Sequence, residues 1–328
     1  MRSLQDRLFS RNYITSFVLH VVCVALWFSP FLFEKNTLCP ISISFLGIPF
    51  LELSPLFASI FQFLLFVALG NVINMFLISF RLVPLQNKYF YFIFLFLMSV
   101  TLQVQSFSNT SIAFLFFLLS LFQLFRIFQS ENVYRVFNST FLLSIAVFFN
   151  VEYVYFFPFV IIALLLLRAL TLRTFLSSLL GIFSVAFIFL SVFYLTDTFQ
   201  NVQSYFALSK EMGGFDVVRS FSVMNFIGIG LLFFSLLFYV FSYISNRTTR
   251  SINVRSYSAL INLLLIALFL VYIINFRQVE ASLILILFSL SYFVTLFYIH
   301  RRSKFSNYSL IVMLSLGLAY RITELVLM

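Results

Sequence analysis

The stretch from residue 141 to residue 197 reads FLLSIAVFFNVEYVYFFPFVIIALLLLRALTLRTFLSSLLGIFSVAFIFLSVFYLTD. Its only charged residues are Glu152, Arg168, Arg173 and Asp197, and apolar runs fill the space between them. A helix that crosses the hydrocarbon core of a bilayer needs about 20 consecutive, mostly apolar residues. The stretch therefore has room for successive membrane-spanning helices that are joined by very short loops.

The rest of the chain has the same composition. Charged residues make up 9% of it, and Phe accounts for 51 of 328 residues, whereas roughly a quarter of the residues of a soluble domain are charged. Backbone groups in lipid must be satisfied internally, so the spans are helices or a closed barrel. Barrel strands alternate apolar and polar residues, but ranges such as 161–167 and 231–241 do not. We therefore predict an all-α, polytopic transmembrane helix bundle that forms a single integral membrane domain over residues 1–328.

The apolar runs predict eleven spans, of which the fifth is the shortest. An odd number of spans places the two termini on opposite sides of the membrane. The predicted spans cover residues 14–33, 56–80, 89–105, 111–128, 138–151, 153–171, 175–196, 222–246, 257–276, 279–299 and 306–327.

The net charge of +10 arises from basic residues at the predicted span ends. Cytoplasmic loops of membrane proteins carry an excess of Lys and Arg, so the charge indicates topology, and we expect no nucleic-acid partner. With the N-terminus inside and the C-terminus outside, 15 of the 20 basic residues are cytoplasmic. These are Arg2, Arg7, Arg11, Arg81, Lys88, Arg126, Arg135, Arg168, Arg173, Arg247, Arg250, Arg255, Arg301, Arg302 and Lys304.

Most acidic residues fall on the opposite, external side. Two external segments are long enough to form caps, residues 34–55 and residues 196–220, and neither could form a soluble catalytic domain. The first is apolar and broken by Pro and Gly, so we expect it to lie along the membrane surface or to dip back into it. The second predicts an interfacial helix. The external acids are Glu34, Glu52, Glu152, Asp197, Glu211, Asp216, Glu280 and Glu324.

A few polar residues lie inside the predicted spans, where an unpaired amide costs several kcal/mol. Asn71 and Asn74 are three residues apart, which puts them on one helix face, and they either pair across a helix interface or line a wet cavity. Arg321 and Glu324 have the spacing of an ion pair along one helix. His20 in the first span is expected to make a packing hydrogen bond. Glu152, in a tight turn at interface depth, is a candidate functional carboxylate.

The stretch LFQLFRIFQSENVYRVFNS, residues 121–139, forms a short basic hinge ahead of the helix pair quoted first. This arrangement resembles the helix–hinge–helix core of multispan lipid-linked glycosyltransferases of the GT-C class. It also resembles an uncharacterised family of bacterial multispan membrane proteins of about this length. Both resemblances cover about 80 residues and depend on hydropathy and on the placement of Arg.

The GT-C resemblance implies a polyprenyl-phosphate-linked sugar as donor and a carboxylate base in the first external loop, where Glu34 and Glu52 lie. A divalent metal or basic residues would balance the lipid phosphate. The paired acids that many members of the class carry are absent from this loop. Glu152 is a further candidate because it is predicted to lie at the depth of the membrane interface. The candidate catalytic residues are therefore Glu34, Glu52 and Glu152. The candidate lipid-phosphate or substrate-binding residues are Lys210, Arg219, Arg277, Asn71 and Asn74.

Three classes of function remain open from the sequence. The first is a GT-C-like transferase that acts on a lipid-linked sugar or a lipid at the outer leaflet of the bacterial inner membrane. The second is a non-catalytic subunit or scaffold that binds other membrane proteins, which the low density of buried charge favours. The third is a transporter, although no internal repeat supports it. A polar cavity open to the outer leaflet would distinguish the enzyme from the scaffold.

Overall fold

We describe the fold from a computed structural model. It describes residues 13–32, 41–45, 48–83, 88–101, 104–105, 107–128, 132–195, 252–274, 279–300 and 304–327. Some of the residues and segments singled out in the sequence lie outside this set. They are Glu34, Lys210, Arg219, Arg277, the cap at 196–220 and the predicted span at 222–246.

The described part of the chain is almost entirely helical, as the sequence predicts. Each of the predicted spans that falls on described residues overlaps a helix, but several of these helices are shorter than predicted: the span expected at 153–171 contains α7, which has 10 residues, and the number of spans stays a prediction. The helices are α2 (Tyr13–Leu32), α3 (Pro55–Ser79), α4 (Tyr89–Val100), α5 (Asn109–Phe125), α6 (Val133–Phe149), η2 (a 3-10 helix, Val151–Phe156), α7 (Phe157–Leu166), α8 (Leu172–Leu195), α11 (Ile252–Ile274), α12 (Val279–His300) and α13 (Lys304–Leu327).

Two of the described helices, α3 and α8, are long and apolar enough to cross a membrane by length and composition. Shorter apolar helices, among them α4, α5 and α6, accompany them. Pro55 starts α3 at its first turn, where a missing backbone N–H costs nothing. No Gly or Pro interrupts the 12 residues of α4.

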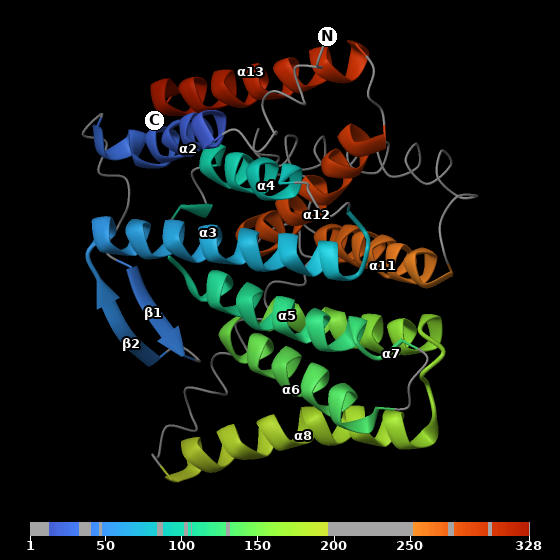
Figure 1. Ribbon diagram of the computed structural model, residues 1–328. Helices are drawn as coiled ribbons and strands as arrows, with labels where there is room; N and C mark the ends of the chain where they lie inside the picture. The colour runs from blue at the N-terminus through green and yellow to red at the C-terminus, as the bar shows by residue number, and fades with distance from the viewer. Residues whose placement is uncertain are drawn as a thin grey trace.

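The helices stack in layers, with α2 and α13 at one face of the molecule and α8 at the other (Figure 1). The middle of the stack is the most enclosed part. Helix α4 packs against α2, α3, α12 and α13, and all of its residues except Leu97 are buried. Residues 283–296 of α12 are buried throughout. The core is therefore built largely from Phe, Leu and Ile on helices that are covered on every side.

Helices α5, α6 and α8 pack through small and hydroxyl-bearing residues. Ser120 Oγ of α5 donates to the Ser139 carbonyl at 2.7 Å, and Ser139 Oγ of α6 donates back to the Ser120 carbonyl at 3.1 Å. A Cβ on Gly181 of α8 would lie 2.1 Å from Thr140 Oγ1 and 2.8 Å from the Phe137 carbonyl oxygen. Only glycine allows α8 to approach α6 this closely.

The described part of the predicted first cap is a β-hairpin, which the all-α prediction did not include. Strands β1 (Ile41–Phe45) and β2 (Ile48–Leu53) pair antiparallel, and the position of this segment relative to the membrane stays a prediction. The alternation of apolar residues and Ser in ISISF is a strand pattern. Pro49 pairs with Ser44 beside a register irregularity, which is where a sheet tolerates proline. The all-α description therefore needs this one correction.

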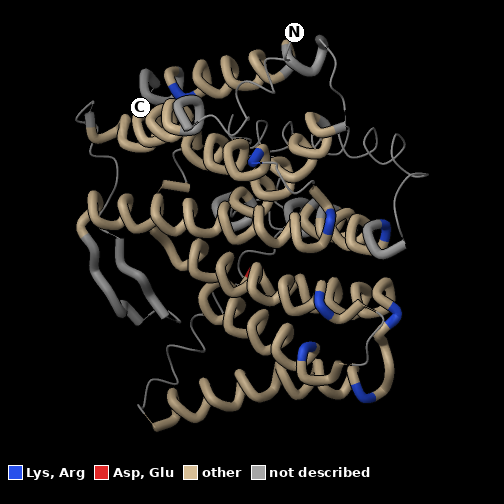
Figure 2. Tube along the Cα trace, viewed as in Figure 1, with Lys and Arg blue, Asp and Glu red and all other residues tan. Residues whose placement is uncertain are grey.

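Basic residues gather at the end of the bundle opposite the hairpin (Figures 1 and 2). They follow the last residues of α3, α5 and α7, and they precede or begin α6, α8 and α11. We call this end of the bundle the basic end, and the other the hairpin end. The residues are Arg81, Arg126, Arg135, Arg168, Arg173 and Arg255.

Two helices finish at the basic end in the same unusual way. Arg81 after α3 and Arg168 after α7 have positive φ angles of 56° and 55°. The next residue in each case, Leu82 or Ala169, is buried and returns its N–H to a carbonyl five residues earlier. This is the Schellman arrangement, in which glycine is the usual left-handed residue. Here each left-handed position carries an exposed cation instead.

Candidate functional site

The hairpin end is where the predicted catalytic carboxylates belong, and several helix ends meet there. Strand β2 leads directly into α3, and β1 contacts both α5 and α6. Figure 1 shows the hairpin beside the start of α3. Buried and half-buried polar side chains from α2, α3, α5, α13 and the 104–105 and 150–152 segments lie at this end, and we call them the polar cluster. Its members are Ser29, Gln62, Gln105, Thr110, Ser111, Asn150, Glu152 and Arg321.

Arg321 in α13 is the most deeply buried charge among the described side chains, with 1% of its surface exposed. Its Nη2 donates to the Leu26 carbonyl and to Gln105 Oε1, both at 2.9 Å. Its Nε donates to Ser29 Oγ at 3.1 Å. The sequence predicted a pair with Glu324, whose side chain lies outside the described part. The observed contacts show that Arg321 ties α13 to α2 and to the 104–105 segment.

Two glutamines continue the cluster away from Arg321. Gln62 Nε2 of α3 donates to Ser111 Oγ at 2.6 Å and to the Val104 carbonyl at 3.0 Å, and Gln105 Nε2 donates to the Ser99 carbonyl at 2.9 Å. Both side chains are fully buried. Gln62 Oε1 accepts no hydrogen bond from the described residues. The amides therefore hold the connection between α4 and α5 against α3.

Glu152 lies at the far side of the cluster in η2, the single turn between α6 and α7. It is 7% exposed, so it is neither a solvated rim residue nor a loop residue in open water. Asn150 starts the turn: its Oδ1 accepts from the Glu152 backbone N–H at 2.9 Å, and its Nδ2 lies 3.4 Å from Thr110 Oγ1 of α5. The cap therefore fixes the backbone that carries the carboxylate.

The polar cluster has a cation at one side and a carboxylate at the other. Arg321 contacts Gln105, Gln62 joins the 104–105 segment to the start of α5, and Asn150 joins the start of α5 to Glu152. Interhelical hydrogen bonds of this kind hold membrane helices together. The chemistry that they support directly is the fixing of helix ends, and Glu152 is the one group whose proton affinity could serve a reaction.

The remaining predicted site residues are spread over the fold. Glu52 lies in β2, where its register partner is Ser42. Asn71 and Asn74 do not share an environment: Asn71 is exposed and donates to the Val67 carbonyl of its own helix, whereas Asn74 is buried. Positions three apart still differ by about 60° around a helix, and the α3 interface ends between them. The two side chains therefore differ in exposure, and a shared role in substrate binding stays a prediction.

Two further contacts join α2 to neighbouring helices, and only the second was expected from the sequence. Trp27 Nε1 of α2 donates to Ser59 Oγ at 2.9 Å and lies 3.1 Å from the Ser59 carbonyl, and His20 Nε2 lies 2.8 Å from the Tyr91 hydroxyl. The second contact agrees with the packing role expected of His20. The sequence offered one signal for the Trp27 contact, since Trp27 is the only Trp of the chain. Its partner Ser59 lies 32 residues later, about one helical turn before Gln62 on α3.

Within the described residues, no three His, Cys, Asp or Glu side chains gather as they would around a metal ion. The divalent metal that the GT-C resemblance implies stays a prediction. No protein-family model, no curated protein and no solved structure matches this chain. The argument for function consequently depends on the residues and their geometry.

Proposed function

We propose that this chain is a multispan protein of the bacterial inner membrane that acts as a non-catalytic subunit or scaffold. The membrane part of the proposal is supported by how residues are distributed across α8. Its face toward α6 carries Thr174, Ser177, Ser178 and Gly181, all closely packed. Its opposite face exposes Phe183 and Phe187 by 64% and 73%. Small residues inside and bulky apolar residues outside suit a helix in lipid.

The orientation part of the proposal is supported by the two ends of the bundle. Basic residues at the ends of α3, α5 and α7 and at the starts of α6, α8 and α11 lie at one end, opposite the hairpin (Figure 2). An excess of Arg and Lys marks the cytoplasmic side. A reporter that works only outside the cytoplasm is expected to be active when fused after Met328 and inactive when fused after Arg250. Activity of the fusion after Arg250 would show that the proposed orientation is wrong.

The scaffold part of the proposal is carried by one observation. Polar side chains buried at the hairpin end bond to neighbouring helices and to the segment between α4 and α5, most clearly Arg321, which bonds to α2 and to Gln105. A side chain that holds two helices together is not available to bind a substrate phosphate. On this proposal, the partners are other membrane proteins of an envelope complex together with membrane lipid.

Glu152 supports a second candidate function, a GT-C-like transferase. It is buried, Asn150 fixes its backbone, and it lies at the same end as the hairpin that carries Glu52. Burial is how proteins tune a carboxylate to act as a general base. The donor would be a polyprenyl-phosphate-linked sugar or another lipid, and Glu52 and Glu152 would be the candidate bases.

One comparison distinguishes the two candidates. Glu52→Gln and Glu152→Gln each keep the shape of the side chain but remove the base. If the protein is a scaffold, both variants should copurify with the same membrane proteins as the wild type and should support normal growth and envelope glycan composition. If either variant is stable and correctly inserted but changes the lipid-linked glycans of the cell, the scaffold proposal is wrong and the transferase is favoured.

A further inference from the structure

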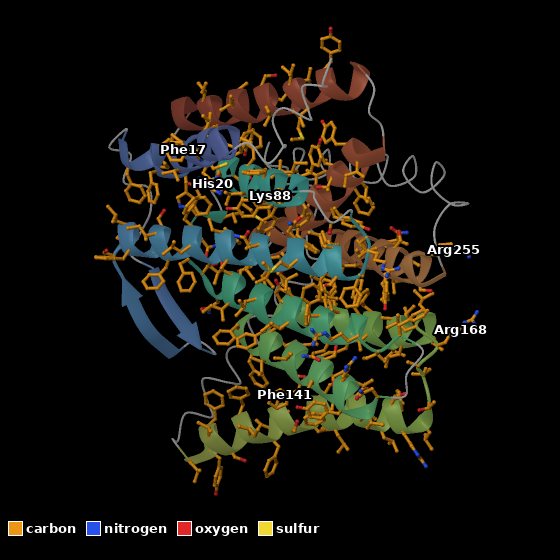
Figure 3. The ribbon with its side chains drawn as sticks, in the orientation of Figure 1. Phe17, His20, Lys88, Phe141, Arg168 and Arg255 are labelled. Carbon is orange, nitrogen blue, oxygen red and sulfur yellow. The ribbon has the colours of Figure 1, made fainter. Side chains whose placement is uncertain are left out.

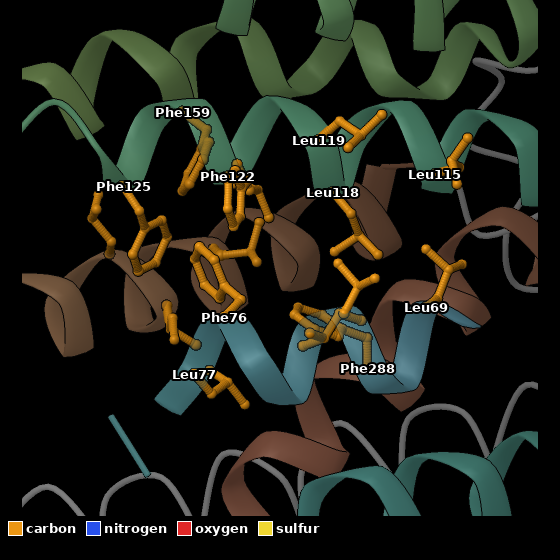
Figure 4. Close-up of a pocket in the computed structure, with 16 residues that line it drawn as sticks. Leu69, Phe76, Leu77, Leu115, Leu118, Leu119, Phe122, Phe125, Phe159 and Phe288 are labelled. Atoms are coloured by element: carbon orange, nitrogen blue, oxygen red, sulfur yellow. The ribbon is translucent and has the colours of Figure 1, made fainter. Parts of the chain in front are cut away.

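An apolar cavity of about 130 Å³ lies between α3, α5, α7, α11 and α12 (Figure 4). All of its lining side chains are Leu, Ile, Val or Phe. Val72 and Leu119 line it and are also exposed on the surface of the bundle, so the cavity opens between α3 and α5. Cavities of this size with such walls stay dry and accept an apolar guest. The walls provide no hydrogen bond for a sugar or an ion.

Aromatic rings close the end of the cavity that faces the basic end. Phe125 of α5 lines the cavity and packs on Phe76 of α3, with ring centroids 4.9 Å apart. Tyr257 of α11 stacks on Phe125 at 5.5 Å and contacts Phe80 at 5.0 Å. These rings bring together the last turn of α3, the last turn of α5 and the first turns of α11, which are far apart in the sequence.

Three arginines lie next to residues of this aromatic group in the sequence. Arg81 follows Phe80, Arg126 follows Phe125, and Arg255 is two residues before Tyr257. All three side chains are exposed, and none forms an ion pair with a carboxylate among the described residues. The Arg126 guanidinium lies 4.1 Å from the ring centroid of Phe122, which lines the cavity. Figure 3 shows Arg255 pointing away from the bundle.

We propose that this cavity takes a short part of one acyl chain of an anionic glycerophospholipid, whose phosphate is bound by Arg81 and Arg126, with Arg255 adding positive charge nearby. The dry walls fit a hydrocarbon chain, and the cations at the aromatic end fit a negative headgroup at the depth where that chain begins. Guanidinium groups match phosphate oxygens in geometry and remain charged at any physiological pH. The site rests on the proposed membrane placement, in which the basic end faces the cytoplasmic leaflet.

The strength of the headgroup contact follows from the charge. Each Arg or Lys near an anionic lipid surface contributes about 1 kcal/mol, which is about a fivefold change in affinity. Removing two of the three arginines should therefore weaken binding by about 25-fold. A cavity that held only hydrocarbon, without a headgroup site, would show no such dependence.

The test uses the full chain purified in detergent and two photoactivatable probes that carry a diazirine in the acyl chain, phosphatidylglycerol and phosphatidylcholine. Peptides of α3 and α5 that line the cavity are analysed for label at a series of probe concentrations. We expect phosphatidylglycerol to label them at much lower concentration. Arg81→Gln with Arg126→Gln should shift its half-maximal labelling by about 25-fold and should leave phosphatidylcholine within about twofold.

The matched control is Arg168→Gln with Arg173→Gln, which removes two exposed arginines from the same end, away from the cavity walls. This pair should leave labelling by both probes unchanged. An equal shift from both pairs would show general attraction to the charged end and would overturn the site. Leu118→Phe fills the cavity and should reduce labelling by both probes. Labelling that stays outside α3 and α5 in the wild type would also overturn the proposal.

Failure of this site and failure of the proposed function are distinguishable. The labelling is done in detergent and does not depend on which end faces the cytoplasm or on whether the protein is a scaffold. The reporter fusions and the copurification test address those points without any lipid probe. A protein with the expected orientation but without selective labelling would refute the lipid site alone.

Discussion

The two ends of the bundle use arginine in opposite ways. At the basic end, Arg81, Arg126, Arg168 and Arg255 are exposed and lie at helix ends. At the hairpin end, Arg321 is buried and bonds to Ser29, Leu26 and Gln105. An exposed cation keeps its water and contributes little to folding, whereas a buried one loses that water and depends on hydrogen bonds from the protein. The comparison predicts that equal substitutions at the two ends have unequal effects.

The largest effect is expected from Arg321→Ala. It removes three hydrogen bonds, leaves Gln105 Oε1 without its donor and opens a cavity, so the free energy of unfolding should fall by ~3 kcal/mol. Arg255→Ala at the basic end is the matched control and should change it by less than ~0.5 kcal/mol. Denaturant unfolding of the purified protein in detergent measures both. Similar effects at the two ends would remove the distinction between them.

A smaller loss is expected from Gln62→Leu. The change keeps the volume but leaves the Val104 carbonyl and the Ser111 hydroxyl without their donor, at a cost of ~1–2 kcal/mol. Phe61→Leu is the control, since Phe61 is the neighbouring residue on the exposed face of α3, and it should stay within ~0.5 kcal/mol. Thermal unfolding followed by circular dichroism compares the two variants. If Gln62→Leu is as stable as the wild type, the polar cluster does not hold α3.

The smallest change in the free energy of unfolding is expected from Arg81→Gly at the basic end, and this substitution should raise it. Arg81 has a φ angle of 56°, and a left-handed conformation costs an L-residue ~1 kcal/mol or more. Arg81→Gly should therefore stabilise the fold by up to ~1 kcal/mol, since part of the gain is offset by the freer unfolded chain. Arg173→Gly inside α8 should instead destabilise it by up to ~1 kcal/mol. If both variants shift the unfolding midpoint in the same direction, the left-handed position is not what limits stability at Arg81.

The sequence predicts the positions of the helices better than it predicts the contacts of the candidate site. The positions of α2 to α8 and α11 to α13 follow from apolar runs and from Pro, Gly and Arg at their ends, because these signals are local. The hairpin had a local signal too, the alternation in ISISF, but Pro and Gly in the same segment were interpreted as breaks. The role of Arg321 had no local signal in the sequence, because its partners Leu26 and Gln105 are far from it in the chain.

The candidate carboxylates show the same limit. Their external placement follows from counting spans, yet Glu152 is buried and Glu52 belongs to a strand, two environments that the sequence did not separate. Asn71 and Asn74 have helical spacing, but the edge of the α3 interface passes between them. A helix face is a property of one segment, whereas an interface needs a second segment whose position is set by packing.

The sequence by itself determined that the described part of the chain forms apolar helices and that most of the cations in that part lie at helix ends. Hydrophobicity and charge act through composition and spacing, and these can be read along the chain. Only the tertiary structure decided which of the described cations are buried, that Gly181 lets α8 approach α6, and that the neighbours of Arg81, Arg126 and Arg255 in the sequence form one aromatic group. Those features depend on contacts between residues many positions apart, which helix packing brings together and no local pattern encodes.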